Sequence, residues 1–205
     1  MREILVATAN KGKLREIGEI LSMLPVTLSS LADYWDPVPA IPETGKTFRE
    51  NALLKASWVF RNMNRPQKVR WILADDSGLE VDALNGLPGV RSARFAGDAV
   101  DTAANNKKLL ELLAAVPVGR RTARFRCATV LMTSSAEDYF EAEGVCEGTI
   151  AFSESGTGGF GYDPLFVPEG FSRTFAELEP AEKHAISHRG RALEKVRSYC
   201  HEKLS

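Results

Sequence analysis

The feature that most constrains the fold is an apolar run that ends in two adjacent carboxylates. Residues 69–74 predict a short buried strand, and Asp75-Asp76-Ser77-Gly78 follows it directly. Ser-Gly is a turn pair, so we expect the strand to stop there. Two adjacent acids at the end of a core strand repel each other and are costly to desolvate, which a divalent cation would relieve. The alternative is an acidic turn that simply faces water.

A polar loop with two lysines follows the first predicted strand. We expect a strand over residues 3–7, a loop over Thr8-Ala9-Asn10-Lys11-Gly12-Lys13, and a helix over residues 14–24. The N–H groups and the dipole at a helix N-terminus attract phosphate, so this loop is a candidate phosphate site. It is not a Walker A loop, because the first glycine is absent and Leu14 replaces the Ser or Thr. The alternative is an ordinary turn with solvated lysines.

The second predicted helix starts at a capping-box sequence. Residues 26–42 contain several prolines and are expected to be irregular, whereas Thr47 and Glu50 have the capping-box spacing. We therefore expect a helix from Thr47 to about Asn62. Lys55 lies at the border of its apolar face, where its ammonium group either points at a phosphate or snorkels past its neighbours to water.

The middle of the chain predicts further strands and one helix. Residues 79–84 alternate like a half-exposed strand, and Asp101 or Thr102 caps a helix that runs to about Ala115. Residues 122–132 read as a strand, and residues 139–150 as one or two more. A long hairpin of this kind favours antiparallel pairing, so we expect a mixed sheet. No linker or repeat divides residues 1–205, which predicts a single domain.

A glycine-rich loop at residues 156–164 is the second unusual stretch. Four glycines allow the backbone to approach a ligand closely, and Phe160 and Tyr162 lie among them. An aromatic ring on such a loop can stack on a base, although a turn with incidental aromatics is the alternative. Residues 165–167 resume a strand. The last helix is expected to open near Lys183, with Ser187 as its N-cap and with His188 and Arg189 beside that N-terminus, where an anion or a keto oxygen would offset their charge.

The overall composition excludes several classes of protein. The 26 Lys and Arg residues balance 27 Asp and Glu, for a formal net charge of −1, which does not favour a protein that coats nucleic acid or an anionic membrane. No stretch has the length or hydropathy of a signal peptide or a bilayer-spanning helix. The three cysteines are far apart and are expected to be reduced thiols in a cytoplasmic protein.

Taken together, these stretches resemble the inosine/xanthosine triphosphate pyrophosphatase family, house-cleaning enzymes that hydrolyse non-standard purine nucleotides. The matching segments occur in the family's order and span nearly the whole chain: residues 8–13, 43–55, 74–79, 88–95, 158–164 and 185–190. The resemblance implies an α/β fold with an elongated central mixed sheet and flanking helices that form two lobes around a nucleotide cleft. It also implies a homodimer, a requirement for Mg²⁺, and hydrolysis of ITP, dITP or XTP to the monophosphate and pyrophosphate.

The resemblance also assigns roles to individual residues. Asp76 would be the catalytic proton acceptor for the attacking water, and Asp76, Asp75 and Glu43 would hold the metal. The substrate-binding residues that it implies are Thr8, Ala9, Asn10, Lys11, Gly12, Lys13, Lys55, Ser77, Phe160, Gly161, Tyr162, Asp163, Lys183, His188 and Arg189. As hydrogen-bond donors, His188 and Arg189 would favour a 6-keto purine over a 6-amino purine.

Two positions depart from the family's pattern. Pro42 stands where many members carry a second acid before Glu43, so the metal would have to rely on the remaining carboxylates. Ala9 stands where glycine is common, a change that its backbone angles have to permit. Two other functions fit the same residues: a phosphatase that releases orthophosphate, and a nucleotide-sensing module without turnover.

Overall fold

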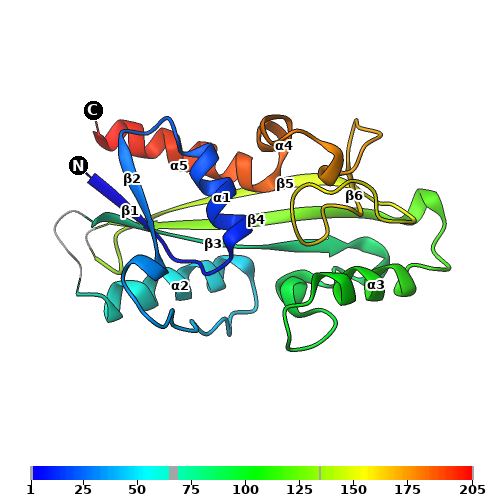
Figure 1. Ribbon diagram of the computed structural model, residues 1–205, viewed down its shortest axis with the longest axis horizontal. Coiled ribbons are helices and arrows are strands. Elements are labelled where there is room, and N and C mark those ends of the chain that lie inside the picture. The colour runs from blue at the N-terminus through cyan, green and yellow to red at the C-terminus, as the bar shows by residue number, and fades with distance from the viewer. Residues whose placement is uncertain (1, 65–68, 134, 205) are drawn as a thin grey trace. The chain divides into compact units, whose positions relative to one another are not determined.

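The chain forms two compact units, each built from separate stretches of sequence. The computed structural model describes residues 2–64, 69–133 and 135–204 (Figure 1). The first unit comprises Met1–Asp76, Cys127–Gly144 and Arg189–Ser205, and the second comprises Ser77–Arg126 and Val145–His188. Because the polypeptide passes from one unit to the other several times, a linker sought in the sequence would not have revealed this division. The single domain over residues 1–205 stays a prediction.

The strands form one mixed sheet in the order β2-β1-β3-β4-β5-β6. Strand β1 pairs in parallel with both β2 and β3, whereas β5 and β6 pair antiparallel, so the predicted mixed sheet is confirmed. Three of the strands, β3, β4 and β5, carry residues of both units. The strand bounds are Arg2–Val6 for β1, Val26–Ser30 for β2, Val69–Val81 for β3, Thr122–Met132 for β4, Tyr139–Ile150 for β5 and Phe166–Pro168 for β6.

Five α-helices accompany these strands in the described part of the chain. They are α1 (Lys11–Ile20), α2 (Phe48–Asn62), α3 (Thr102–Leu112), α4 (Pro180–Ile186) and α5 (His188–Leu204). The side chain of Thr47 accepts a hydrogen bond from the backbone of Glu50, and Asp101 caps α3 in the same way, so both predicted helix starts are confirmed.

The core of the first unit has two layers, one on each face of the sheet. Helices α1 and α5 cover one face, where they pack on Ile4, Trp71 and Leu73. Helix α2 covers the other face and packs on Leu5 and Ile72 (Figure 1). This alternation follows from the strand period of two, which sends successive side chains to opposite faces. Each fully buried aliphatic side chain of this kind contributes about 1.5–3 kcal/mol.

The second unit has a separate core with three aromatic rings at its centre. Phe125 lies edge-on to Phe166 at 4.8 Å between ring centroids, and Phe166 lies 5.0 Å from Phe175. Leu109 of α3 and Leu113, which follows the last residue of that helix, are fully buried in the same cluster. The glycine-rich loop and α4 therefore start from a rigid apolar base within this unit.

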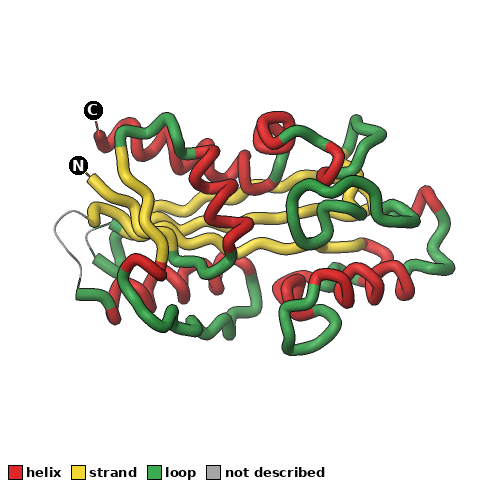
Figure 2. The backbone as a smooth tube through the Cα atoms, in the orientation of Figure 1, coloured by secondary structure: helices red, strands yellow, loops and turns green. Residues whose placement is uncertain are grey.

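Some predicted elements differ from those in the structure. Strand β3 does not stop at residue 74 but continues to Val81, so the turn predicted at residues 75–78 is wrong, and residues 82–84 form a 3₁₀ turn instead of a strand (Figure 2). Helix α1 begins at Lys11 instead of Leu14 and ends at Ile20. Strand β2 lies in the stretch predicted to be irregular, and α4 is a separate short helix before the last one. The last helix begins at His188, directly after the predicted N-cap Ser187.

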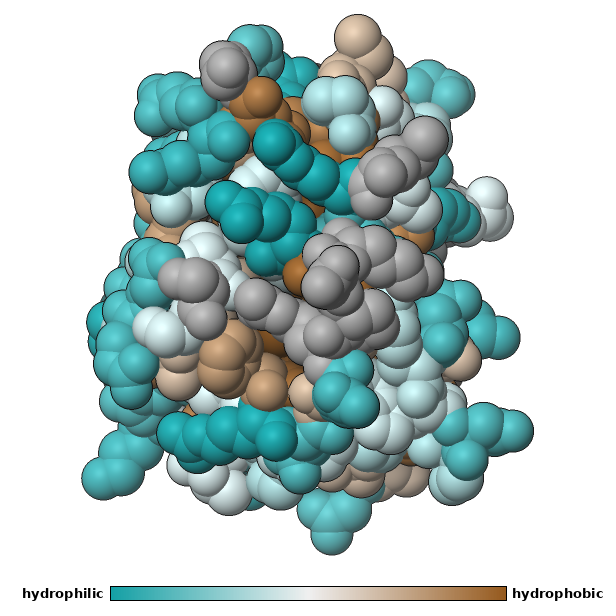
Figure 3. Space-filling model, turned by 90° about the vertical axis from the view of Figure 1, so that its left-hand side faces the viewer, coloured by the Kyte–Doolittle hydropathy of each residue, from teal (hydrophilic) through white to brown (hydrophobic). Residues whose placement is uncertain are grey.

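Hydrophilic side chains cover much of the face drawn in Figure 3, with smaller brown areas of apolar residues between them. Among the described residues, no helix combines the length and the apolar character needed to span a bilayer. Cys127, Cys146 and Cys200 are all buried and form no disulfide bond with one another.

Candidate functional site

The two acids in the middle of β3 point to opposite faces of the sheet. Asp75 follows the register of Trp71 and Leu73, which face α1 and α5, whereas Asp76 follows Ile72 and Ala74, which face α2. Both side chains are buried, Asp75 at 0% and Asp76 at 7% exposure. Adjacent in sequence, they are therefore surrounded by different partners, and each has to be considered by itself.

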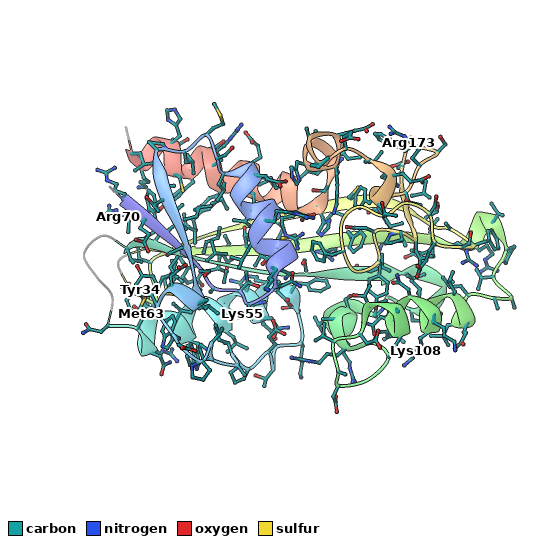
Figure 4. All side chains as sticks on the ribbon, viewed as in Figure 1. Tyr34, Lys55, Met63, Arg70, Lys108 and Arg173 are labelled. Carbon is teal, nitrogen blue, oxygen red and sulfur yellow. The ribbon has the colours of Figure 1, made fainter. Side chains whose placement is uncertain are left out.

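Asp76 lies under helix α2, which supplies two of its partners. The Asn51 amide donates from Nδ2 to Oδ2 of Asp76 at 3.0 Å. The ammonium group of Lys55 (labelled in Figure 4) lies 3.2 Å from Oδ1 of Asp76 and 2.7 Å from Oε1 of Glu43. Asn51 and Lys55 are four residues apart, so both project from one side of α2. The buried lysine is aimed at the carboxylates and does not snorkel to water.

Lys55 keeps its charge in this setting. Burial acts to lower the pKa of Lys55, but the negative charges of Asp76, Asp75 and Glu43 outweigh burial and raise the pKa above its ordinary value. Glu43 and Asp76 thus share one cation within hydrogen-bonding distance of both. Such a pair of carboxylates is also the donor set that suits a hard divalent cation.

No group of three or more His, Cys, Asp or Glu side chains within residues 2–64, 69–133 and 135–204 is placed to hold a metal ion. Magnesium, however, is commonly held by only one or two carboxylates, with substrate phosphates and water completing its octahedron. Glu43 and Asp76 fit that mode of binding. Pro42, next to Glu43, has no carboxylate that could add a further ligand to such a magnesium ion.

Asp75 is paired with cations on the opposite face of the sheet. Its Oδ2 lies 3.1 Å from the ammonium group of Lys13 and 3.2 Å from the guanidinium of Arg189. Arg189 also donates to Oε2 of Glu16 on α1 at 2.5 Å. Burial alone would raise the pKa of Asp75, but the charges of Lys13 and Arg189 hold it well below its usual range. The other oxygen of Asp75, Oδ1, is buried without a hydrogen-bond partner among the described residues.

The predicted phosphate loop forms the N-terminus of α1. Asn10 caps the helix, because its Oδ1 accepts a hydrogen bond from the backbone of Lys13 at 3.0 Å. The hydroxyl group of Thr8 accepts from the backbone of Asn10 at 3.2 Å, which holds the residues before the helix in a compact turn. Asn85 is the one non-glycine residue with positive φ in the described part of the chain, so Ala9 replaces glycine without backbone strain. The loop keeps the geometry of an anion-binding helix start.

The glycine-rich loop of the second unit is closed by a buried ion pair. Lys183 of α4 donates to Oδ2 of Asp163 at 2.6 Å, and the backbone N–H of Phe160 donates to the same oxygen at 2.8 Å. The ammonium group also lies 5.4 Å from the centroid of the half-buried Phe160 ring. Gly159 has a φ of +70°, and a Cβ there would lie 2.0 Å from Oδ2 of Asp163. Only glycine therefore fits at this position.

The residues beside that pair are held by hydrogen bonds to their neighbours. The hydroxyl of Tyr162 donates to the backbone oxygen of Ser92 at 2.8 Å, and burial raises the pKa of Tyr162, so it stays a phenol. Asn106 of α3 donates to the backbone oxygen of Gly161 at 3.3 Å. Tyr162 is thus an anchor of the loop in the core, while Phe160 remains partly accessible. Ser77, in β3, is half-buried.

His188 and Arg189 are the first two residues of α5 and are both buried, at 4% and 2% exposure. The His188 ring stacks on Phe125 with centroids 4.7 Å apart and planes within 11°. Arg189 makes the ion pairs with Asp75 and Glu16 described above. Burial lowers the pKa of Arg189, but these two carboxylates outweigh burial and raise it above its ordinary value. The contact of His188 and Arg189 with a keto oxygen of the substrate stays a prediction.

Two residues of the site were not among the predicted site residues. Glu16 is a buried acid on the apolar side of α1, next to Ile17, and a charge in such a place signals a buried partner. Asn51 lies in the first turns of α2, where a polar residue is ordinary, so only its 2% exposure in the folded chain distinguishes it.

Comparison with known proteins places this chain in a family. The model of the Ham1 family matches residues 4–199. A dITP/XTP pyrophosphatase of Geobacter sulfurreducens is 52% identical over 193 residues, which cover 94% of this chain and 94% of that protein. A dITP/XTP pyrophosphatase of Exiguobacterium sibiricum is 50% identical over 194 residues, with 95% and 94% covered. The solved structure of a HAM1 protein from Coxiella burnetii is 42% identical and covers 98% of this chain and 100% of its own, with a TM-score of 0.83. The expected α/β fold is therefore confirmed, and the chain belongs to the Ham1 family.

Proposed function

We propose that the protein hydrolyses non-standard purine nucleoside triphosphates, namely ITP, dITP and XTP, to the monophosphate and pyrophosphate. By doing so it would keep these nucleotides out of DNA and RNA. The observation that carries the proposal is the buried carboxylate of Asp76, held by Asn51 and by Lys55, which also contacts Glu43. Relatives named dITP/XTP pyrophosphatase share about half of their residues with this chain over nearly its full length, which supports the substrate class.

The first unit supplies the groups that suit a triphosphate. The N-terminus of α1, with residues Thr8 to Lys13, offers N–H groups and the positive end of the helix dipole. Lys13 and Lys55 add two ammonium groups, each of which forms an ion pair with a carboxylate of β3. Phosphoryl transfer depends mainly on positioning and on stabilising charge, so these cations are suited to bind the phosphates and the developing negative charge.

Asp76 and Glu43 are the residues that would hold Mg²⁺ in this proposal. A magnesium ion bound there would supply positive charge to neutralise the phosphate oxygens and would help to orient the attacking water. Asp75, also predicted as a metal ligand, has its Oδ2 bound to Lys13 and Arg189 on the other face of β3, so we assign it the role of a buried counter-charge to them. Asp76 accepts the proton from water at a carboxylate oxygen, while Lys55 remains protonated beside it.

Residues of the second unit, and Arg189 of the first, are assigned to the base and sugar. Phe160 offers a half-buried ring on a glycine frame for stacking, and Lys183 and Asp163 form the polar pair beside it. His188 and Arg189 are proposed to favour a 6-keto group, because both present hydrogen-bond donors. The substrate-binding assignments of Ser77, Gly161 and Tyr162 rest on the family resemblance. The homodimeric assembly and the cytoplasmic location that we include in the proposal rest on the same resemblance.

Replacing Asp76 by Asn tests the catalytic assignment. Asn has nearly the shape of Asp but cannot accept the proton, so Asp76→Asn should lower kcat for ITP by at least about 1,000-fold, a loss in the upper range for general-base groups. Pyrophosphate release measures turnover, and calorimetry measures whether ITP still binds. The exposed Glu202→Gln on α5 serves as the matched control for loss of one carboxylate. Retention of most of the wild-type rate by Asp76→Asn would show that Asp76 is not the base.

A further inference from the structure

Asn51 connects the segment that carries Glu43 to the carboxylate of Asp76. Its side chain is 2% exposed and has a polar partner at each end. Oδ1 accepts a hydrogen bond from the backbone N–H of Gly45 at 2.8 Å, and Nδ2 donates to Oδ2 of Asp76 at 3.0 Å. One amide thus bridges the turn that precedes α2 and the middle of β3.

The two partners fix which way the amide of Asn51 faces. The backbone N–H of Gly45 can only donate, and an ionised carboxylate can only accept. Rotation of the amide by 180° would place donor against donor and acceptor against acceptor, which costs both hydrogen bonds. The orientation of Asn51 is therefore determined by chemistry at both ends.

Asn51 also determines how the oxygens of Asp76 are used. Oδ2 is occupied by Asn51, whereas Oδ1 faces Lys55, which in turn binds Glu43. A carboxylate held at both oxygens cannot rotate freely about its terminal bond, so each oxygen keeps one direction. A base has to present a defined oxygen within hydrogen-bond reach of the water that it activates.

The helix start does not need the amide of Asn51. Thr47 is the N-cap of α2 and accepts from the backbone of Glu50 at 3.1 Å. Glu50 accepts from the backbone of Lys46 at 2.7 Å, which completes the capping at this end. The contact of Asn51 with Gly45 is also tightly fitted, because a Cβ on Gly45 would lie 2.7 Å from Oδ1 of Asn51. The glycine allows the backbone to approach the amide.

We propose that Asn51 is a positioning residue that sets the orientation of the Asp76 carboxylate and ties the Glu43 segment to it. Asn51 acts through Asp76 and touches no reacting atom. This inference rests on the proposed function, in which Asp76 is the base and Glu43 helps to hold the metal. It adds a residue that links those two carboxylates to each other.

Two substitutions separate the two hydrogen bonds. Asn51→Asp keeps an acceptor for the N–H of Gly45 but loses the donor to Asp76, whereas Asn51→Ala loses both. Asn62→Ala is the matched control, because Asn62 is an exposed residue at the end of the same helix whose side chain donates to the backbone of Trp58. Thermal unfolding establishes that each variant is folded before its activity is compared.

Steady-state kinetics with ITP and Mg²⁺ tests the link to Asp76. Both Asn51→Asp and Asn51→Ala should lower kcat by about 10- to 100-fold, the loss expected for one hydrogen bond to a charged group. KM should change less than about threefold, because the phosphate-binding residues are untouched. Asn62→Ala should match the wild type. A wild-type kcat in the folded Asn51→Asp variant, or a loss confined to KM, would overturn the proposal.

Amide hydrogen exchange at Gly45 tests the other hydrogen bond without any substrate. The amide should exchange at least about tenfold faster in Asn51→Ala and at the wild-type rate in Asn51→Asp. Equal protection in all three proteins would overturn the link to the Glu43 segment. If the wild type hydrolyses no nucleotide while the exchange pattern is as expected, the proposed function fails and the structural link stands, so the two failures are distinguishable.

Discussion

At the scale of single residues, the two adjacent acids of β3 have different partners, and we assign them different roles. Asp75 is fully buried between Lys13 and Arg189, whereas Asp76 faces Asn51 and Lys55. The repulsion that suggested a shared metal is relieved instead by cations on each face. The sequence contained the right residues, but the direction in which each points depends on the continuation of β3 through the pair.

Asp75→Asn should destabilise the protein at neutral pH. The substitution removes the carboxylate that pairs with both the buried guanidinium of Arg189 and the ammonium group of Lys13. Breaking a buried ion pair from one side typically costs about 3–5 kcal/mol. Urea unfolding at pH 7 measures the difference in free energy of unfolding from the wild type. A difference below about 1 kcal/mol would show that Asp75 is not the counter-charge.

The difference in stability between the wild type and Asp75→Asn should also depend on pH, and the lowered pKa of Asp75 sets the direction of that dependence. Because the folded pKa of Asp75 lies below its unfolded value of about 3.9, its stabilisation is complete above that pH and is lost as the pH falls further. The difference in free energy of unfolding between wild type and Asp75→Asn should therefore decrease below about pH 4, by about 1.4 kcal/mol per pH unit. A difference that stays constant from pH 7 to pH 3 would contradict the lowered pKa of Asp75.

At the scale of elements, local signals predicted where α2 and α3 start but not where α1 starts, although Asn10 caps α1 with its side chain. Thr47 with Glu50 marked the start of α2, and Asp101 marked α3. By contrast, Asp and Gly are depleted in strands, so residues 75–78 predicted a turn, and pairing within the sheet overrode that preference in β3. Strand β2 was not predicted, because the prolines that follow it led us to expect irregular structure over residues 26–42. Helix α4 did carry a usable signal, namely Pro180 at its first position.

The glycine-rich loop supports a prediction about element geometry. Gly159→Ala adds a Cβ that would lie 2.0 Å from Oδ2 of Asp163, so the Asp163–Lys183 pair has to move. KM for ITP should rise by about tenfold or more, with a smaller change in kcat. Gly170→Ala is the matched control, because Gly170 also has positive φ but has open space around it. Equal kinetic effects of the two variants would mean that backbone strain alone is responsible.

At the scale of the whole molecule, the candidate residues divide between the two units. Lys13, Glu43, Lys55 and Asp76 belong to the first unit, and Phe160, Asp163 and Lys183 belong to the second. Each group is locally complete, with cations held against carboxylates inside its own unit. The motifs could be recognised in the sequence because each is short and continuous. The contacts of Glu16 with Arg189 could not, since 173 positions separate them and only the fold brings them together.

Product analysis with four nucleotides would decide whether the protein is a pyrophosphatase. ITP, XTP, GTP and ATP would be incubated in parallel with the wild-type protein and Mg²⁺, and the phosphorus products identified. We expect pyrophosphate and monophosphate from ITP and XTP, with little from GTP and ATP. Orthophosphate as the first product would contradict this expectation in favour of a phosphatase, and Mg²⁺-dependent binding of ITP without turnover would contradict it in favour of a sensor.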